Sequence, residues 1–378
     1  MKLVHISDLH LGKRVNGFSM LDDQQYILNE MLNIIKSESV SAVLISGDVY
    51  DKTIPPAEAV ALFDRFLTGI TSLGAKALII SGNHDSAERL AFGRSAMTSG
   101  GIYIAPVFSG TVAKTILTDE YGNINVYMLP FLKPLTVRPF YEDIDIPDTE
   151  SAVKAVLDGI TLDKKERNII MAHQFITGAE RSDSEEVYVG GLDNVGAELF
   201  AGFDYTALGH IHRPQNIGGD KIRYCGTPIK YSFSEINDKK SVTVIDMKEK
   251  NNVSVKAVPL VPLRDMRHIK GSYAEVTDRA GYINTATDDY LYITLTDEED
   301  VFDAIGRLRS IYPNIMKIDY ENKRTSADNF IDTAGESVNK SPAELFGELY
   351  ELQNNSPMSA EQKVFLDGII KDIWEAEK

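Results

Sequence analysis

Five short stretches of the chain place histidine, aspartate or asparagine side chains where polar loops follow apolar runs. The stretches are Asp8-Leu9-His10, Gly47-Asp48, Gly82-Asn83-His84-Asp85, Ala172-His173 and Gly209-His210-Ile211-His212. Five of the seven histidines lie in them, and the other two, His5 and His268, are expected to be structural. Imidazole nitrogens combined with carboxylate and amide oxygens suit manganese, iron or zinc better than calcium or magnesium. The pattern therefore predicts a metal centre.

The spacing within two stretches indicates how their side chains converge. In an extended segment, residues two apart project to the same side, so Asp8 and His10 can reach one cation. His210 and His212 have the same spacing, and each can reach one of two adjacent cations. Sharp turns at the ends of the apolar runs are expected at three glycines, Gly47, Gly82 and Gly209.

Taken singly, these residues also have ordinary structural interpretations. Asp8 suits a cap, Gly47-Asp48 and Gly82-Asn83 are common turn dipeptides, and His173 follows the kind of apolar run that holds core histidines. The occurrence of all five stretches after strand-like runs is what favours the metal centre.

Alternating strand-like and helical segments supply the framework. Buried strands are predicted at residues 3–6, 42–46 and 77–81, with helical periodicity at 21–35 and 57–73 between them. Further strands are expected at 125–129, 168–172, 205–208, 223–225 and 241–246. We interpret both sets as two halves of a layered α/β core over residues 1–260. Such sheets place their sites just outside the carboxyl ends of the strands.

The remaining third of the chain is predicted to form smaller modules. Residues 264–321 suggest a small α+β domain, with strands at 290–296 and 315–320 around a helix at 298–311, followed by a polar linker at 322–340. Capping boxes at Ser341-Pro-Ala-Glu and Ser359-Ala-Glu-Gln begin two apolar helices within 341–378. Their apolar residues are Leu345, Phe346, Leu349, Tyr350, Leu352, Phe365, Leu366, Ile369, Ile370, Ile373 and Trp374. These helices either fold back on their own domain or dock on a partner protein.

Composition limits the classes of function. The net charge of -17, from 39 basic and 56 acidic residues, argues against a free-standing DNA-binding protein. It does not exclude a DNA-cutting enzyme, because bound cations invert local charge and a partner can supply basic surface. The single cysteine, Cys225, excludes an intrachain disulfide, and no apolar run reaches the roughly 18 residues of a membrane span. We expect a cytoplasmic protein, since no signal-peptide pattern precedes the first strand.

The five stretches together resemble the calcineurin-type metallophosphoesterase superfamily. Within it, residues 5–12, 47–51, 81–86 and 209–215, with Tyr224-Cys-Gly-Thr-Pro-Ile-Lys-Tyr-Ser-Phe-Ser-Glu235 and Ser341-Pro-Ala-Glu-Leu-Phe346, resemble the family of SbcD nuclease subunits. The resemblance covers most of the chain and is weakest over 264–340. It implies an α-β-β-α core with a small α+β capping domain and a C-terminal helical docking tail.

The resemblance also implies roles for the motif residues. One cation would be held by Asp8, His10, Asp48 and His212, and the second by Asp48, Asn83, His173 and His210, so that Asp48 bridges them. Manganese is the expected ion, with magnesium as the alternative, and two such ions activate a shared water for attack on phosphorus. His84 would face the leaving group. Asp85 either orients His84 or caps the following helix.

The resemblance also implies an activity. We expect the chain to be a 3′-to-5′ exonuclease on double strands and an endonuclease on single strands or hairpins, used in DNA recombination and repair. The partner would be an SbcC-type ATPase bound by the C-terminal helices, around a homodimer within a heterotetramer. Lys13 and Arg14 are candidates for DNA phosphate contacts, and similar candidates are Arg89, Lys133, Arg138 and Arg213. Two alternatives stay open: a related phosphoesterase acting on a small nucleotide or phosphoprotein, and a non-catalytic scaffold on the same fold.

Overall fold

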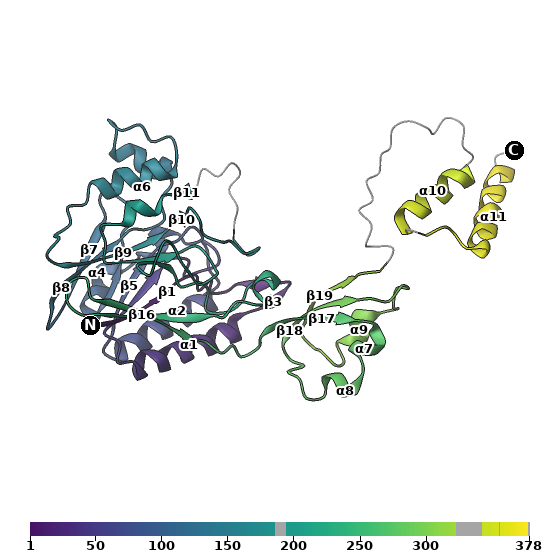
Figure 1. The fold of residues 1–378 in the computed structure, drawn as a ribbon, viewed down its shortest axis with the longest axis horizontal. Helices are drawn as coiled ribbons and strands as arrows, with labels where there is room; N and C mark the ends of the chain where they lie inside the picture. The colour runs from purple at the N-terminus through teal and green to yellow at the C-terminus, as the bar shows by residue number, and fades with distance from the viewer. Residues whose placement is uncertain (186–193, 323–341, 355, 377–378) are drawn as a thin grey trace. The chain divides into compact units, whose positions relative to one another are not determined.

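The computed structural model describes residues 1–185, 194–322, 342–354 and 356–376. It divides into two units, Met1–Asp265 and Met266–Lys378, each described separately below (Figure 1). The first unit contains all five predicted metal-binding stretches.

One six-stranded sheet of the first unit has the order β16-β15-β1-β4-β5-β6. Its strands are β1 (Lys2–Ile6), β4 (Ala42–Ser46), β5 (Lys76–Ile80), β6 (Ile102–Ile104), β15 (Ser241–Met247) and β16 (Val253–Pro259). The first four are parallel to one another, and β15 and β16 extend the sheet in antiparallel fashion. The parallel arrangement brings the carboxyl ends of β1, β4 and β5 to the same edge.

The second six-stranded sheet has the order β13-β14-β12-β9-β8-β7. Its strands are β7 (Ala113–Asp119), β8 (Gly122–Met128), β9 (Arg167–His173), β12 (Tyr205–Gly209), β13 (Gln215–Asn216) and β14 (Ile222–Tyr224). The four inner strands are parallel, and β7 and β13 are antiparallel edges. His173 ends β9, and the next parallel strand, β12, leads into His210.

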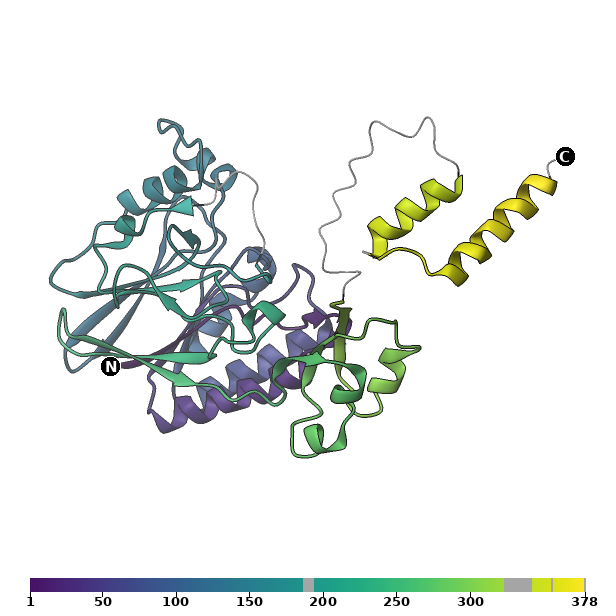
Figure 2. The ribbon, with the colours of Figure 1, turned by 45° about the vertical axis from the view of Figure 1, so that its right-hand side comes forward.

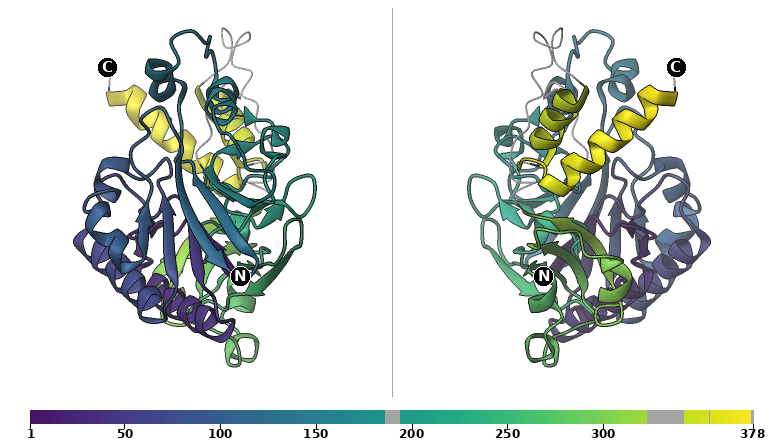
Figure 3. Two further views of the ribbon diagram at one scale, coloured as in Figure 1. Left: turned by 90° about the vertical axis from the view of Figure 1, so that its left-hand side faces the viewer. Right: turned by 90° about the vertical axis from the view of Figure 1, so that its right-hand side faces the viewer.

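A continuous apolar core joins the two sheets. Side chains from the first sheet, such as Leu44 and Leu78, pack with Val126, Ile169 and Ala207 from the second. Helices cover the outer faces: α1 (Leu21–Ser37) and α2 (Ala57–Ser72) lie side by side along the first sheet, and α6 (Thr149–Asp158) packs on the second (Figures 2 and 3). The predicted α-β-β-α layering is therefore confirmed.

Short elements complete the first unit. They are the helices α3 (Ala87–Leu90), α4 (Arg94–Met97) and α5 (Pro134–Val137), the 3₁₀ turns η1 (Thr98–Gly100), η2 (Arg138–Phe140), η3 (Ala197–Phe200) and η4 (Phe233–Glu235), and the strand pairs β2 (Arg14–Val15) with β3 (Phe18–Ser19) and β10 (Phe175–Ile176) with β11 (Asn194–Val195). The strand pairs fold the loops that follow β1 and β9.

The second unit contains a parallel three-stranded sheet of β17 (Met266–Gly271), β18 (Tyr290–Leu295) and β19 (Ile315–Tyr320). Its helices are α7 (Tyr273–Val276), α8 (Arg279–Tyr282) and α9 (Ala304–Leu308). The prediction of one helix over 298–311 was wrong in extent, because Asp303 has a left-handed φ of 48° and the chain becomes helical only after it. Strand β17 was not anticipated.

Two helices end the second unit, α10 (Pro342–Asn354) and α11 (Ala360–Ala376). The predicted capping box at Ser359 is present, because its backbone N–H donates to Gln362 Oε1 and its hydroxyl accepts from the Gln362 N–H. Ser341 and most of the predicted 322–340 linker lie outside the described residues, as do the side chains of Leu352, Ile373 and Trp374. Within the described part of the chain, no helix is long and apolar enough to cross a membrane.

Candidate metal centre

The loops after β1, β4, β5, β9 and β12 gather at one edge of the two sheets. They bring together all seven predicted ligands and His84 from segments as far apart in sequence as residues 8 and 212. Six of the seven predicted ligands are almost completely buried: Asp8, His10, Asp48, His173, His210 and His212. Asn83 and His84 are half-buried, so they mark the side of the cluster that solvent reaches.

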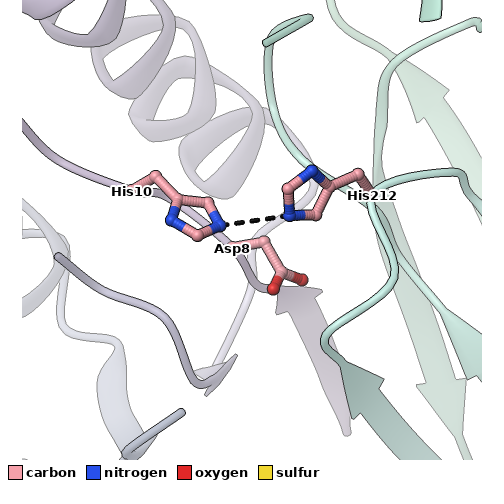
Figure 4. A group of neighbouring side chains, drawn as sticks. All are labelled: Asp8, His10 and His212. Carbon is pink, nitrogen blue, oxygen red and sulfur yellow. Dashed lines mark hydrogen bonds between the residues drawn. The ribbon is translucent and has the colours of Figure 1, made fainter. Parts of the chain in front are cut away.

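One half of the cluster contains Asp8, His10 and His212 (Figure 4). The Nε2 atoms of the two histidines face each other at 3.1 Å. A carboxylate oxygen of Asp48 lies 3.8 Å from His10 Nε2 and so reaches this half as well. Ring nitrogens directed at a common point beside carboxylates are what a cation with mixed ligands requires.

The other half contains Asn83, His173 and His210. The amide oxygen of Asn83 lies 3.0 Å from His173 Nε2 and 3.0 Å from His210 Nδ1. The same Asp48 oxygen that faces His10 is 3.3 Å from His173 Nε2. Asp48 is therefore common to the two halves.

Hydrogen bonds behind the ligands fix which nitrogen is available. His173 Nδ1 lies 2.8 Å from the carbonyl oxygen of Ser46, which can only accept, so Nδ1 carries a proton and Nε2 faces Asp48 and Asn83. Burial alone would lower the pKa of His173, but the Asp48 carboxylate raises it to about 9, so a cation bound there would have to displace the Nε2 proton. Burial, followed by the charge of His173, lowers the pKa of His210 to about 3. Burial also holds the pKa of His212 well below its usual range. Both rings are neutral near pH 7, the form that binds metals.

The donor set fits divalent cations for a further reason. Carboxylates and imidazoles packed this closely lose their hydration, and burying such charge without compensation costs several kcal/mol or more. His10 Nδ1 is buried without a hydrogen-bond partner, although Asp51 Oδ1 is 3.7 Å away. Cations among these ligands would compensate the buried negative charge.

Four predicted ligands have a left-handed backbone: Asp8 (φ 53°), His10 (φ 44°), Asp48 (φ 46°) and His210 (φ 100°). The expectation that Asp8 and His10 converge through an extended segment was therefore wrong in mechanism, although both side chains lie in the same half. Left-handed conformations of residues other than glycine cost free energy and concentrate at functional sites. His210 and His212 do point into different halves of the cluster.

The three glycines of the motifs mainly leave room for neighbouring side-chain and main-chain atoms. An added Cβ would lie 2.3 Å from His173 Nδ1 at Gly47, 2.1 Å from Asp48 Oδ1 at Gly82 and 1.9 Å from the Ser46 carbonyl oxygen at Gly209. Only Gly47, with φ 88°, also needs a left-handed backbone. The predicted role in sharp turning therefore holds for Gly47, and close packing explains the other two.

His84 stands at the accessible side of the cluster. Its Nδ1 lies 3.0 Å from the carbonyl oxygen of Asp51, and its backbone N–H donates to Asp48 Oδ1 at 2.9 Å. Its ring meets the His10 ring edge-on at 4.8 Å between centroids. The carbonyl fixes the proton on Nδ1 and leaves Nε2 on the free side of the ring.

Both expectations for Asp85 were wrong. Its carboxylate accepts backbone N–H bonds from Val49, Tyr50 and Gly82 at 2.9–3.1 Å. The hydroxyl of Ser86 caps α3 instead. Asp85 therefore ties together the loops that carry Asp48 and Asn83.

Comparison with known proteins agrees with this geometry. The calcineurin-like phosphoesterase family model matches residues 1–214, and the model described as the type 5 capsule protein repressor C-terminal domain matches residues 262–354. A relative from Staphylococcus epidermidis, the SbcD component of the SbcCD nuclease, is 32% identical over 324 residues, covering 84% of this chain and 85% of its own. The chain belongs to the SbcD family of calcineurin-like phosphoesterases. The family predicted from the motifs is confirmed.

A much more distant likeness is to a crystal structure of a dimetal phosphatase from Danio rerio. It has a TM-score of 0.41 and 10% identity, and covers 70% of this chain and 98% of the other. Membership of the phosphoesterase family makes this SbcD-family chain a phosphoester hydrolase that uses divalent metal ions.

Sequence reasoning missed the residues that brace the loops of this SbcD-family site. Gln24 of α1 donates to the His10 carbonyl oxygen at 2.8 Å and accepts from the Gly12 N–H at 3.0 Å. The Tyr231 hydroxyl donates to the Leu9 carbonyl oxygen at 2.5 Å. Tyr231 and buried Glu235 lie within the Tyr224–Glu235 motif, which was the available signal.

Two of the basic residues predicted to contact DNA phosphates form ion pairs within the chain. Lys13 is paired with Asp51 at 2.8 Å, and Arg213 with both Glu180 and Asp238. Lys13 therefore links the loop that carries Asp8 and His10 to the loop that carries Asp48.

Proposed function

We propose that this chain is the nuclease subunit of an SbcCD-type complex and cleaves DNA phosphodiesters with two divalent cations, acting in the cytoplasm in DNA recombination and repair. The observation that carries the proposal is Asp48, whose carboxylate faces His10 in one half of the cluster and His173 in the other. A shared carboxylate between two nitrogen-rich ligand groups is the arrangement that a two-cation phosphoesterase needs.

In this proposal each half of the cluster holds one cation. The first would be bound by Asp8, His10, Asp48 and His212, and the second by Asp48, Asn83, His173 and His210. Bound cations would neutralise charge on the phosphoryl oxygens and lower the pKa of an attacking water. The mixed nitrogen and oxygen donors favour Mn²⁺, and Mg²⁺ is the alternative that the family resemblance implies.

His84 acts at the leaving group in this proposal. It is half-buried beside Asp48 and His10, and the Asp51 carbonyl oxygen fixes its ring while Nε2 is left for the substrate. With Nδ1–H held by the carbonyl, His84 can act as an acid only as the imidazolium, whose second proton, on Nε2, can pass to the departing oxygen and leave the neutral ring. Such general-acid catalysis contributes typically ~10²–10⁴-fold. The chain thus supplies the leaving-group acid, and no protein nucleophile is required.

DNA as substrate rests on membership of the SbcD family, whose curated relative is named a nuclease. The net charge of -17 means that the chain needs help to hold a polyanion. We propose that an SbcC-type ATPase binds α10 and α11, supplies basic surface and controls access to the metal centre. The expected activities are 3′-to-5′ exonuclease on double strands and endonuclease on single strands and hairpins.

Roles for the parts of the chain follow from the same proposal. Residues 1–260 would be the nuclease domain, 264–321 the capping domain, 322–340 the linker and 341–378 the docking module. An apolar groove of about 320 Å³, lined by Phe63, Leu67, Leu90, Phe92 and Met97 among others, suits a second copy of the chain. Phe92 is 82% exposed there, which supports a homodimer within a heterotetramer.

The test is a cleavage assay on hairpin and linear DNA with Mn²⁺ or Mg²⁺, with and without the SbcC-type partner. We expect Mn²⁺-dependent cleavage that the partner and ATP enhance. Turnover of a small phosphodiester without cleavage of any DNA would overturn the nuclease assignment in favour of a small-substrate phosphoesterase. Absence of all turnover with both metals would favour the non-catalytic scaffold.

A further inference from the structure

A chain of side chains leads from a buried carboxylate to one of the predicted ligands. Glu235 is fully buried, and Ser184 Oγ donates to its Oε1 at 2.6 Å. The same hydroxyl oxygen lies 2.6 Å from His212 Nδ1. The three groups form a relay whose far end is the ring facing His10 in the metal centre.

The direction of the hydrogen bonds in this relay follows from the charges. Lys240 Nζ lies 2.5 Å from Glu235 Oε2 and stabilises the ionised carboxylate, which can only accept. Thr227 Oγ1 donates to the same carboxylate at 3.3 Å. Ser184 therefore gives its single proton to Glu235, and its oxygen is left to accept from His212 Nδ1–H. The lone pair of the neutral ring is then on Nε2.

The backbone of His212 is held by the same group of residues. Glu185 Oε1 accepts the His212 N–H at 2.6 Å, and Lys240 Nζ donates to its carbonyl oxygen at 2.9 Å. His173 in the other half of the cluster is fixed by the main-chain carbonyl of Ser46. The two halves therefore differ: side chains orient the ligand in one, and main chain orients it in the other.

We propose that Glu235 and Ser184 are positioning residues for the cation site of Asp8, His10 and His212. The Ser184 hydroxyl, polarised by Glu235, holds His212 in the Nδ1–H tautomer with Nε2 directed at the cation. The inference rests on the proposed two-cation function. Partners of this kind behind metal-ligating histidines typically change metal affinity by ~10–100-fold.

The test is Mn²⁺ binding to the full chain, measured by isothermal titration calorimetry. Ser184→Ala removes the relay and leaves the Glu235–Lys240 pair, so we expect the affinity for one of the two Mn²⁺ ions to fall roughly ten- to a hundredfold. Affinity for the other ion should not change. Ser184→Thr keeps a hydroxyl and should restore the affinity, which a loss of packing alone would not predict.

Thr206→Val is the matched control. It removes a buried hydroxyl that has no hydrogen-bond partner among the described residues and takes no part in the relay, and we expect wild-type affinity for both ions. Glu235→Gln should reproduce the Ser184→Ala defect, because its amide can donate to Ser184 and reverse the relay. Unchanged affinities in Ser184→Ala, or equal losses in Ser184→Ala and Thr206→Val, would overturn the inference.

These outcomes are separable from those of the proposed function. A wild-type chain that cleaves DNA while Ser184→Ala binds both ions normally overturns the relay alone. A one-site loss in Ser184→Ala, with no DNA cleavage by the wild type, supports the relay and overturns the nuclease assignment alone.

Discussion

The metal centre and the two C-terminal helices each contain groups in an unfavourable environment, but of opposite kinds: buried polar groups in the first and exposed apolar groups in the second. In the metal centre, carboxylates and imidazoles such as Asp8 and His210 are almost completely withdrawn from water. On the helices, apolar side chains face water: Leu345, Phe346, Leu349, Val364, Phe365 and Ile369 are 39–74% exposed. The first region is stabilised by gaining positive charge, and the second by gaining apolar contact.

The difference between the two regions supports a different proposed ligand for each. A buried cluster of donors selects a small cation, because only an ion fits among atoms about 3 Å apart. An exposed apolar helix pair suits the proposed protein partner, because contiguous apolar area is what a protein partner buries. Chemistry and assembly are therefore separable by mutation, which the following predictions use.

The largest expected effect is at the shared carboxylate. Asp48→Ala should remove a ligand from both cation sites and lower DNA cleavage by at least about a thousandfold, since metal charge stabilisation contributes several kcal/mol. Cleavage rates and Mn²⁺ titration check this. Asp158→Asn, at a carboxylate that is 66% exposed, is the control and should be silent. Retention of two tight Mn²⁺ ions in Asp48→Ala would contradict the shared ligand.

His84→Gln should separate catalysis from cation binding within the same region. We expect cleavage to fall ~10²–10⁴-fold, because the leaving group loses its acid, while both cations bind as before. Parallel measurements of cleavage and Mn²⁺ stoichiometry test the separation. Full activity in this variant would remove His84 from the mechanism.

Substitutions on the helices should affect assembly alone. Phe346→Ser and Phe365→Ser, at side chains 47% and 72% exposed, should each weaken binding of the SbcC-type partner by about 2 kcal/mol, roughly 30-fold. Hydrolysis of a small phosphodiester and the thermal unfolding of the isolated chain should not change. Glu351→Ser, at an exposed polar position of α10, is the control. Unaltered partner affinity in both variants would instead favour helices that fold back on their own domain.

The smallest expected effects are changes in stability at two glycines. Gly82→Ala places a Cβ against Asp48 and should lower the free energy of unfolding by about 1–3 kcal/mol. Gly368→Ala, in α11 with open space around it, should stabilise that helix by up to about 1 kcal/mol. Chemical denaturation of the chain and helix content by circular dichroism measure the two effects. Equal destabilisation by both substitutions would contradict the assigned role of Gly82.

The gathering of the predicted ligands could be anticipated because they lie in local motifs at strand ends. Asp8, Asp48 and His173 each follow an apolar run, and parallel strands bring such ends to one edge whatever the details of packing. The left-handed backbone at Asp8 and Asp48 was not predictable, because it depends on tertiary contacts that no local pattern records. The relay from Glu235 through Ser184 was hidden for the same reason, since its members are 51 residues apart in sequence.

The fold, too, was predictable where the signal is local and unpredictable where tertiary contacts decide. Strands of the core were anticipated because β-branched apolar runs buried on both faces are distinctive. The helix expected over 298–311 failed because its acidic start offered helical propensity, while Asp303 takes a left-handed turn in the folded unit. Local propensity there gave way to tertiary context.

The most direct test of the two-cation account is anomalous diffraction from crystals of the Mn²⁺-loaded chain. We predict two Mn²⁺ peaks about 3.5–4 Å apart, with the Asp48 carboxylate between them and His212 and His173 on opposite ions. A single peak in the cluster, or a pair of peaks without Asp48 between them, would contradict the account.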